Sequence, residues 1–280
     1  MIDPADAHQL DSLLRRHRIE LKHRLGQNFL VDPSLRDAIA RSAGTTRDDE
    51  VLEVGAGVGT LTVALAPACR RLVAVEIDSR LIEALRDVTA GHRNVEIVRS
   101  DILRFDVAST FPGGKEVVVG NIPYNITGAL IRRLLDRTPR PRRLSLVVQK
   151  EVAERWTAAS GASLATVAVK VYAEARIVLV IPSSSFTPPP RVDSALVILD
   201  VRPKPAVGVD DLGSFFKLVA GVFQGRRKQL GGTLGRISGT SSTAAAARLR
   251  DIGIEPERRP QTLDLGEWEA IYEEFRRHGG

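Results

Sequence analysis

The fold class of this chain is decided by residues 50–59, EVLEVGAGVG. Glu50–Val54 predicts a strand, and the glycines Gly55, Gly57 and Gly59 follow it at once. Glycine permits a tight turn and lets backbone amides come close to a ligand, so Gly55 and Gly57 are candidate cofactor-binding residues. The dinucleotide fingerprint places two residues between its second and third glycines, whereas one residue separates each pair here. This spacing favours a different cofactor, with a structural turn that binds nothing as the alternative.

Strands and helices alternate on both sides of this segment. Strands are expected at 50–54, 71–75, 95–98, 116–119, 144–148, 176–181 and 195–201, and helices at 10–21, 33–43, 60–65, 79–90 and 127–135. The alternation up to 144–148 predicts an α/β domain whose parallel sheet carries helices on both faces, and the two later strands are expected to complete that sheet. Residues 183–190 are expected to form a loop, because consecutive prolines cannot donate to a sheet.

A linker is expected at Pro203-Lys204-Pro205, and beyond it the alternation stops. The remaining apolar patterns predict helices at 211–223, 244–251 and 266–277. We therefore expect three parts along the chain. They are an N-terminal helical extension at 1–21, the main α/β domain at 22–203 and a small helical C-terminal domain at 204–280.

Acidic residues follow the next two expected strands. Glu76 lies about twenty residues after the glycine loop, the spacing at which a carboxylate accepts the hydroxyls of a ribose. Asp78 directly precedes the next expected helix and therefore suits the alternative role of a helix cap better than Glu76 does. Asp101 follows the third strand, where it can accept a hydrogen bond from an adenine amino group. An ordinary turn aspartate is the alternative interpretation of Asp101.

The most specific motif is residues 120–125, GNIPYN, which follows the fourth expected strand. We interpret this motif as a site that modifies the amino group of adenine. That group is a poor nucleophile because its lone pair is delocalised into the ring. Asn121 can accept one amino hydrogen through its side-chain oxygen, and the carbonyl of Ile122 or Pro123 can accept the other. Tyr124 can stack on a flipped base. Catalysis would then rest on positioning and electrostatics, without a metal or a covalent intermediate, and an ordinary Asn-x-Pro turn is the alternative.

The charge of the chain indicates a polyanionic partner. Its formal net charge is +6 and its isoelectric point about 9.8, and an excess of Lys and Arg favours phosphate contacts. The positive charge gathers at residues 15–18, 22–24, 137–143 and 226–228. These clusters favour a shared nucleic-acid-binding surface, with solvated helix faces as the alternative.

Other features of the sequence bear on the cellular compartment. The single cysteine, Cys69, cannot form an internal disulfide, and the polar N-terminal residues 1–6 lack the pattern of a secretory signal. The longest apolar runs have the length of strands and are too short to cross a bilayer. A cytoplasmic protein with no membrane partner is therefore expected.

The sequence resembles the ribosomal RNA adenine dimethyltransferases from about residue 22 to residue 265. The segments that carry the resemblance are 26–30 (GQNFL), 53–59 (EVGAGVG), Glu76, Asp101, 120–125 (GNIPYN), 149–155 (QKEVAER), 186–194 (FTPPPRVDS) and 223–228 (FQGRRK). The resemblance implies a Rossmann-like class I methyltransferase domain with a small helical C-terminal domain and S-adenosylmethionine as the cofactor. It implies cofactor contacts at Asn28, Leu30, Gly55, Glu76, Asp101 and Asn121. It further implies handling of the target adenine by Asn121, Pro123, Tyr124 and Phe186.

Two branches of this family differ in their target. One dimethylates two adjacent adenines in a hairpin near the 3′ end of small-subunit rRNA, in an immature subunit, and we expect this activity from a monomer. The segments 149–155, 188–190 and 226–228 resemble that branch. The alternative is the branch that methylates one adenine in large-subunit rRNA and gives macrolide resistance. Ala56, in the glycine loop, resembles that branch. An assembly factor that acts mainly by binding, and a DNA adenine methyltransferase, are further alternatives.

Overall fold

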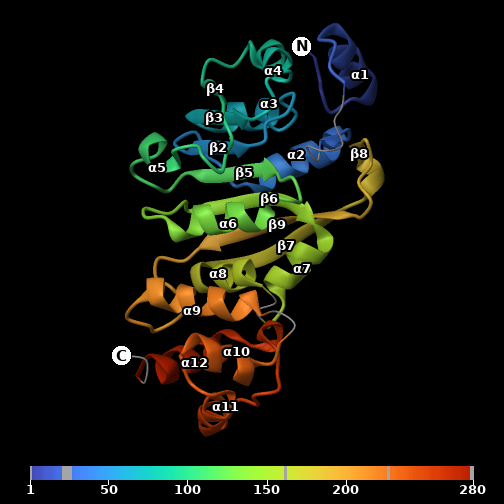
Figure 1. The fold of residues 1–280 in the computed structure, drawn as a ribbon. Coiled ribbons are helices and arrows are strands. Elements are labelled where there is room, and N and C mark those ends of the chain that lie inside the picture. The colour runs from blue at the N-terminus through green and yellow to red at the C-terminus, as the bar shows by residue number, and fades with distance from the viewer. Residues whose placement is uncertain (1, 21–26, 161–162, 226–227, 278–280) are drawn as a thin grey trace. The chain divides into compact units, whose positions relative to one another are not determined.

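The computed structural model describes residues 2–20, 27–160, 163–225 and 228–277, with the side chain of residue 277 left out. Within it the chain forms two compact units (Figure 1). The first contains Met1–Glu154 and Glu174–Val201, and the second contains Arg155–Ala173 and Arg202–Gly280. This division differs from the expected boundaries, because residues 155–173 belong to the helical unit and the N-terminal helix belongs to the first unit.

The first unit is built on a seven-stranded sheet of order β4-β3-β2-β5-β6-β9-β7 (Figure 1). Its strands are β2 (Glu50–Val54), β3 (Arg71–Glu76), β4 (Val95–Arg99), β5 (Val117–Asn121), β6 (Arg143–Gln149), β7 (Ala173–Ile181) and β9 (Ser194–Val201). All seven expected strands are confirmed, and β4, β3, β2, β5 and β6 run parallel to one another. The last two strands complete the sheet as expected, and β9, whose direction the sequence does not give, is antiparallel to β6. A parallel strand needs a crossover connection, and the residues between β7 and β9 contain only a short turn and β8.

The order of the strands reverses between β2 and β5, which are neighbours at the centre of the sheet. Chain connections leave these two strands toward opposite sides of the sheet, so a crevice opens at their carboxyl ends. The glycine loop follows β2, and Asn121 is the last residue of β5. The topology therefore brings the two most informative motifs of the sequence to one edge of the sheet.

Helices cover the sheet of the first unit (Figure 1). They are α1 (Ala7–Arg16), α2 (Pro33–Ser42), α3 (Thr62–Leu65), α4 (Ile82–Thr89), α5 (Val107–Thr110), α6 (Thr127–Asp136) and α7 (Lys150–Thr157), the last of which continues into the second unit. Helix α2 begins as its sequence predicts, because Asp32 accepts a hydrogen bond from Leu35 N at 3.1 Å and Pro33 takes the first helical position. Helix α1 packs its buried Leu10, Leu13 and Leu14 into the same cluster as residues of α4.

A two-stranded ribbon joins β1 (Phe29–Leu30) to β8 (Phe186–Thr187). Phe29 lies opposite Thr187 and Leu30 opposite Phe186, and Val31 N donates to Ser185 O at 2.8 Å. The sequence predicts a loop at 183–190 and no partner for it. Two-residue strands that pair over a long sequence separation leave no local pattern, which explains why this ribbon was not predicted.

The second unit is helical. It contains α8 (Leu164–Tyr172), α9 (Leu212–Gln224), α10 (Leu230–Ile237), α11 (Ser242–Asp251) and α12 (Leu265–Arg277). The helices expected at 211–223, 244–251 and 266–277 are confirmed, whereas α8 and α10 were not predicted. Helix α8 is rich in β-branched valine and α10 contains three glycines, so neither has strong helix propensity. Both helices are instead stabilised by the burial of apolar side chains, such as Leu230 and Leu234 in α10.

Candidate active site

A cavity of about 240 Å³ opens at the carboxyl ends of β2, β3, β4 and β5. It is lined by residues of the first unit alone. The residues singled out in the sequence that line it are Asn28, Leu30, Gly55, Gly57, Glu76, Asp101, Asn121, Pro123 and Phe186. Two candidates do not line the cavity, namely Tyr124 and Ile122, although their neighbours Asn121, Pro123 and Asn125 do.

The glycine loop has the backbone that its sequence predicts. Gly55, Gly57 and Gly59 have φ angles of +70°, +60° and +94°, in the left-handed region that side chains disfavour. A Cβ on Gly57 would also lie 3.1 Å from the ring of Phe29. Gly55 N donates to Val75 O at 2.9 Å, which ties the start of the loop to the end of β3. The loop therefore needs glycine for its conformation, whatever it binds.

Glu76 is 6% exposed and holds this loop from β3. Its Oε2 accepts a hydrogen bond from Gly57 N, and its Oε1 accepts from Ile77 N and Asp78 N, each at 2.8 Å. Burial raises the pKa of Glu76, and the three N–H donors oppose that shift. A carboxylate has about four acceptor sites, so the geometry leaves about one for a ligand. The expectation that Glu76 accepts both ribose hydroxyls therefore becomes an expectation of one such bond.

Asp78 does not cap a helix, because α4 begins at Ile82. Its carboxylate instead pairs with Arg80 and accepts a hydrogen bond from Gln27 Nε2 at 2.8 Å. The Arg80 hydrogen bond is the main reason that the pKa of Asp78 falls to about 2. Gln27 itself lines the cavity, so this contact links the segment before β1 to the end of β3.

Asp101 combines the two roles that the sequence left open. Its Oδ1 accepts a hydrogen bond from Leu103 N at 2.9 Å, as a turn aspartate does. Among the described residues, none donates to its Oδ2, and the residue lines the cavity. One carboxylate oxygen thus stabilises the turn, and the other is available to a ligand in the cavity.

The side-chain amide of Asn121 is oriented by the segment before β1. Its Nδ2 donates to the backbone carbonyl of Asn28 at 2.9 Å. A carbonyl can only accept, so this contact fixes which end of the amide is NH₂ and leaves Oδ1 as an acceptor. No described residue donates to that Oδ1.

The structure also separates the two backbone carbonyls that the sequence left open. Pro123 O already accepts hydrogen bonds from Ile126 N at 3.1 Å and from Thr127 Oγ1 at 3.3 Å. No described residue donates to the carbonyl of Ile122. Of the two carbonyls, that of Ile122 is therefore the one without a hydrogen-bond donor among the described residues.

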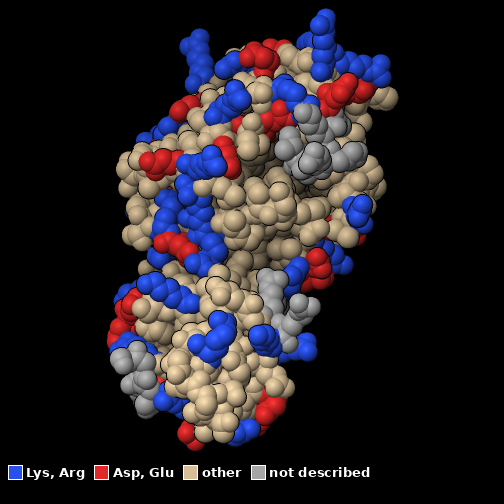
Figure 2. Space-filling view, viewed as in Figure 1, with Lys and Arg blue, Asp and Glu red and all other residues tan. Residues whose placement is uncertain are grey.

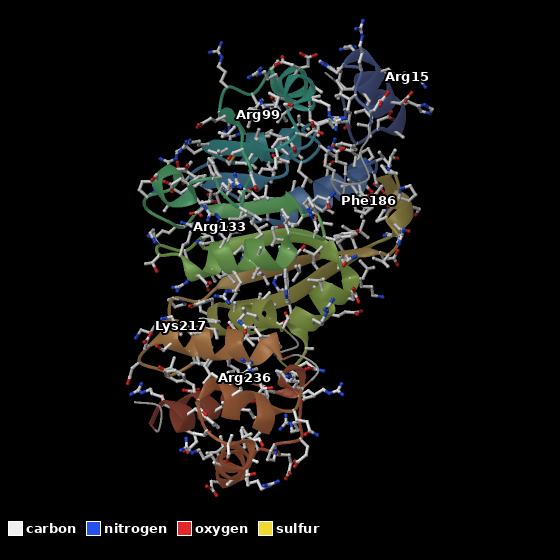
Figure 3. All side chains as sticks on the ribbon, viewed as in Figure 1. Arg15, Arg99, Arg133, Phe186, Lys217 and Arg236 are labelled. Carbon is white, nitrogen blue, oxygen red and sulfur yellow. The ribbon has the colours of Figure 1, made fainter. Side chains whose placement is uncertain are left out.

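Two aromatic side chains flank this region. Phe186, labelled at β8 in Figure 3, is 3% exposed and packs in the core cluster that contains Leu30. It therefore reaches a ligand only through the cavity that it lines. Tyr124 is half-buried, and its hydroxyl lies 3.2 Å from Ser194 Oγ.

Glu53 lines the cavity and was not predicted as a site residue. It is 1% exposed, and burial raises its pKa to about 8, with a further contribution from the charge of Glu76. The carboxyl group is therefore largely protonated at neutral pH and can donate as well as accept. Among the described residues, no atom bonds to its Oε2. The signal in the sequence that could have indicated it is an acidic residue between Leu52 and Val54, two positions before Gly55.

The basic clusters of the sequence differ in whether the structure describes them and in whether their charges are paired. Residues 22–24 and Arg226-Arg227 lie outside the described residues. In the cluster at 137–143, three arginines form ion pairs and so offer an RNA little unpaired charge. The pairs are Arg137–Glu116, Arg142–Asp49 and Arg143–Asp200. Figure 2 shows an uncharged area on the visible face of the first unit with Lys and Arg along one side of it.

Among the described residues, every helix is too short or too polar to span a membrane. The same residues contain no group of three or more His, Cys, Asp or Glu side chains arranged to hold a metal ion.

Comparisons with known proteins give a consistent result. The family model of ribosomal RNA adenine dimethylase matches residues 18–276. Ribosomal RNA small subunit methyltransferase A of Shouchella clausii is 37% identical, covering 98% of both chains, and that of Pelotomaculum thermopropionicum is 38% identical, covering 100% of both. The crystal structure of a dimethyladenosine transferase from Plasmodium falciparum has a TM-score of 0.71 and 26% identity, over 89% of this chain and 97% of that one. The 23S rRNA methyltransferase ErmE has a TM-score of 0.68 and 30% identity, over 89% of this chain and 100% of that one.

Proposed function

The chain belongs to the ribosomal RNA adenine dimethylase family, and from this we propose that it methylates adenine amino groups in small-subunit rRNA with S-adenosylmethionine. The reaction we propose is dimethylation of two adjacent adenines in a hairpin near the 3′ end of that RNA. The fold is a Rossmann-like class I methyltransferase fold with a helical second unit.

The described cavity suits S-adenosylmethionine, which supplies an electrophilic methyl group on a sulfonium when bound. The left-handed glycine loop brings backbone close to the cavity, and Glu76 keeps one acceptor site for a ribose hydroxyl. Asp101 Oδ2 is placed to accept from an adenine amino group of the cofactor. Asn28 and Leu30 line the same cavity, held by the β1–β8 ribbon.

The single observation that carries the proposal is the hydrogen bond from Asn121 Nδ2 to Asn28 O, at 2.9 Å. Because this bond uses Nδ2 and leaves Oδ1 as an acceptor, Asn121 and the Ile122 carbonyl can each accept one hydrogen of an adenine amino group. These two acceptors favour a pyramidal nitrogen with its lone pair directed at the methyl group. They also stabilise the positive charge that develops on the nitrogen during transfer. Tyr124 and Phe186 are proposed to contact the target base.

The relatives favour the small-subunit target. The two bacterial relatives with 37% and 38% identity are small-subunit enzymes, whereas ErmE, a large-subunit enzyme, is 30% identical. Ala56, which resembles the large-subunit branch, is buried and lines the cavity. We assign it a local packing role that does not decide the RNA target.

The remaining parts of the proposal concern the cellular context. We propose an immature small ribosomal subunit in the cytoplasm as the substrate and a monomer as the active form. The helical second unit, with the basic residues 226–228 at its α9–α10 connection, is proposed to contact the RNA backbone.

The test is incubation of the protein with labelled S-adenosylmethionine and undermethylated small or large subunits. We expect label in small-subunit RNA from the wild type and almost none from Asn121→Ala. Binding to immature subunits is measured in parallel. If the wild-type protein bound immature subunits but transferred no methyl group, the proposal would be contradicted and a factor that acts by binding alone would be favoured.

A further inference from the structure

Ser194 is a buried polar side chain that the proposed chemistry does not use. It is 1% exposed and begins β9, where it lies opposite Gln149 of β6. The one hydrogen bond of its hydroxyl among the described residues joins Ser194 Oγ to the Tyr124 hydroxyl, at 3.2 Å. A buried hydroxyl needs a partner, and here that partner is an aromatic residue of the GNIPYN motif.

The two ends of this hydrogen bond differ in how firmly the backbone holds them. Tyr124 lies in a turn after β5, outside any helix or strand. Ser194 belongs to the sheet, and the residue before it is fixed twice. Lys150 N donates to Asp193 O at 3.1 Å, and Asp193 Oδ1 accepts from Ser183 N at 2.9 Å. Ser194 is therefore a fixed point to which the more weakly held Tyr124 is attached.

We propose that Ser194 is a positioning residue that holds the Tyr124 ring in the orientation required for stacking on the target adenine. This inference rests on the proposed function. The hydrogen bond restricts rotation of the Tyr124 side chain, so that less ordering is needed when the base arrives. Ser194 acts through Tyr124 and touches neither the base nor the cofactor.

The functional test compares Ser194→Ala, Tyr124→Phe and the double variant in single-turnover methyl transfer. Loss of one neutral hydrogen bond predicts a rate about three- to tenfold lower in either single variant, with unchanged cofactor affinity. The double variant should be no slower than the single variants, because both remove the same interaction. Ser145→Ala is the matched control. Ser145 is also buried, on the neighbouring strand β6, and its hydroxyl has no partner among the described residues.

A second measurement does not depend on activity. The chain has three tyrosines, so 3-fluorotyrosine labelling should give three ¹⁹F resonances, with that of Tyr124 identified by its loss in Tyr124→Phe. We expect Ser194→Ala to shift this resonance and Ser145→Ala to leave it in place. An unshifted resonance, a wild-type rate in Ser194→Ala, or further slowing in the double variant would each overturn the inference. Absence of methyl transfer by the wild type would instead refute the proposed function and leave the resonance to decide the positioning role.

Discussion

Removal of the Glu76 carboxylate should weaken cofactor binding more than the loss of one contact suggests. In Glu76→Ala, one proposed bond to a ribose hydroxyl disappears, and a hydrogen bond to a charged group contributes about 1.5–3 kcal/mol. That range corresponds to about 10- to 100-fold in affinity. The same change leaves the N–H groups of Gly57, Ile77 and Asp78 without their acceptor, so the glycine loop also loses its anchor. We therefore expect the loss of affinity to exceed this range.

Glu76→Gln separates these two contributions. The glutamine oxygen can still accept from Ile77 N and Asp78 N, but its NH₂ group would then face Gly57 N–H, donor against donor. Affinity should therefore fall in Glu76→Gln also, although less than in Glu76→Ala. Isothermal titration with S-adenosylmethionine measures both values, and Glu83→Ala, an exposed glutamate on α4, is the control. Wild-type affinity in a folded Glu76→Ala protein would refute the role given to this carboxylate.

The remaining predictions concern four other features. Asn121→Ala should lower the single-turnover rate by about 10²–10³ while cofactor binding and fold persist, and a wild-type rate would contradict the acceptor role. Tyr124→Ala should lose stacking of about 1–3 kcal/mol in the same assay, whereas Tyr124→Phe keeps the ring and should lose only the roughly three- to tenfold expected for its hydroxyl; equal inactivity of the two would show that the hydroxyl matters more than the ring. The pKa of Glu53 is raised to about 8, so between about pH 4.5 and pH 8 its carboxyl group is protonated in the folded protein and ionised in the unfolded chain. The free energy of unfolding should therefore fall as the pH rises through this range, by up to about 1.4 kcal/mol per pH unit. Chemical denaturation of Glu53→Gln should show a flatter fall, and an unaltered profile would exclude this group. Neutralising Arg226, Arg227 and Lys228 together should flatten the dependence of RNA affinity on salt without changing cofactor affinity, and an unaltered slope would mean that the cluster is only a solvated surface.

Much of the sheet could be predicted because its information is local. Each strand has its own apolar run, and parallel strands bring their carboxyl ends to one edge, which is enough to place Gly55, Glu76, Asp101 and Asn121 together. The start of α2 could likewise be predicted from Asp32 and the proline that follows it. These features depend on residues within a few positions of one another.

What could not be predicted depends on contacts between distant segments. The β1–β8 ribbon, the bond from Asn121 to Asn28 and the bond from Tyr124 to Ser194 each join residues about 70 or more positions apart. The ion pairs of Arg137, Arg142 and Arg143 could not be predicted either. A run of arginines indicates positive charge, but it does not show which carboxylates lie beside them in the fold. Pattern and charge alone therefore place the site but do not give its hydrogen bonds.

Mapping the methylated nucleotides identifies both the RNA target and the atom that receives the methyl group. Undermethylated small subunits are incubated with the protein and S-adenosylmethionine, and the modified positions are read by mass spectrometry of nuclease fragments. We expect two adjacent N6,N6-dimethyladenines in a hairpin near the 3′ end of small-subunit rRNA, and none in large subunits treated in the same way. Methylation confined to large-subunit RNA, or a product carrying the methyl group on any atom other than the adenine amino nitrogen, would contradict this expectation.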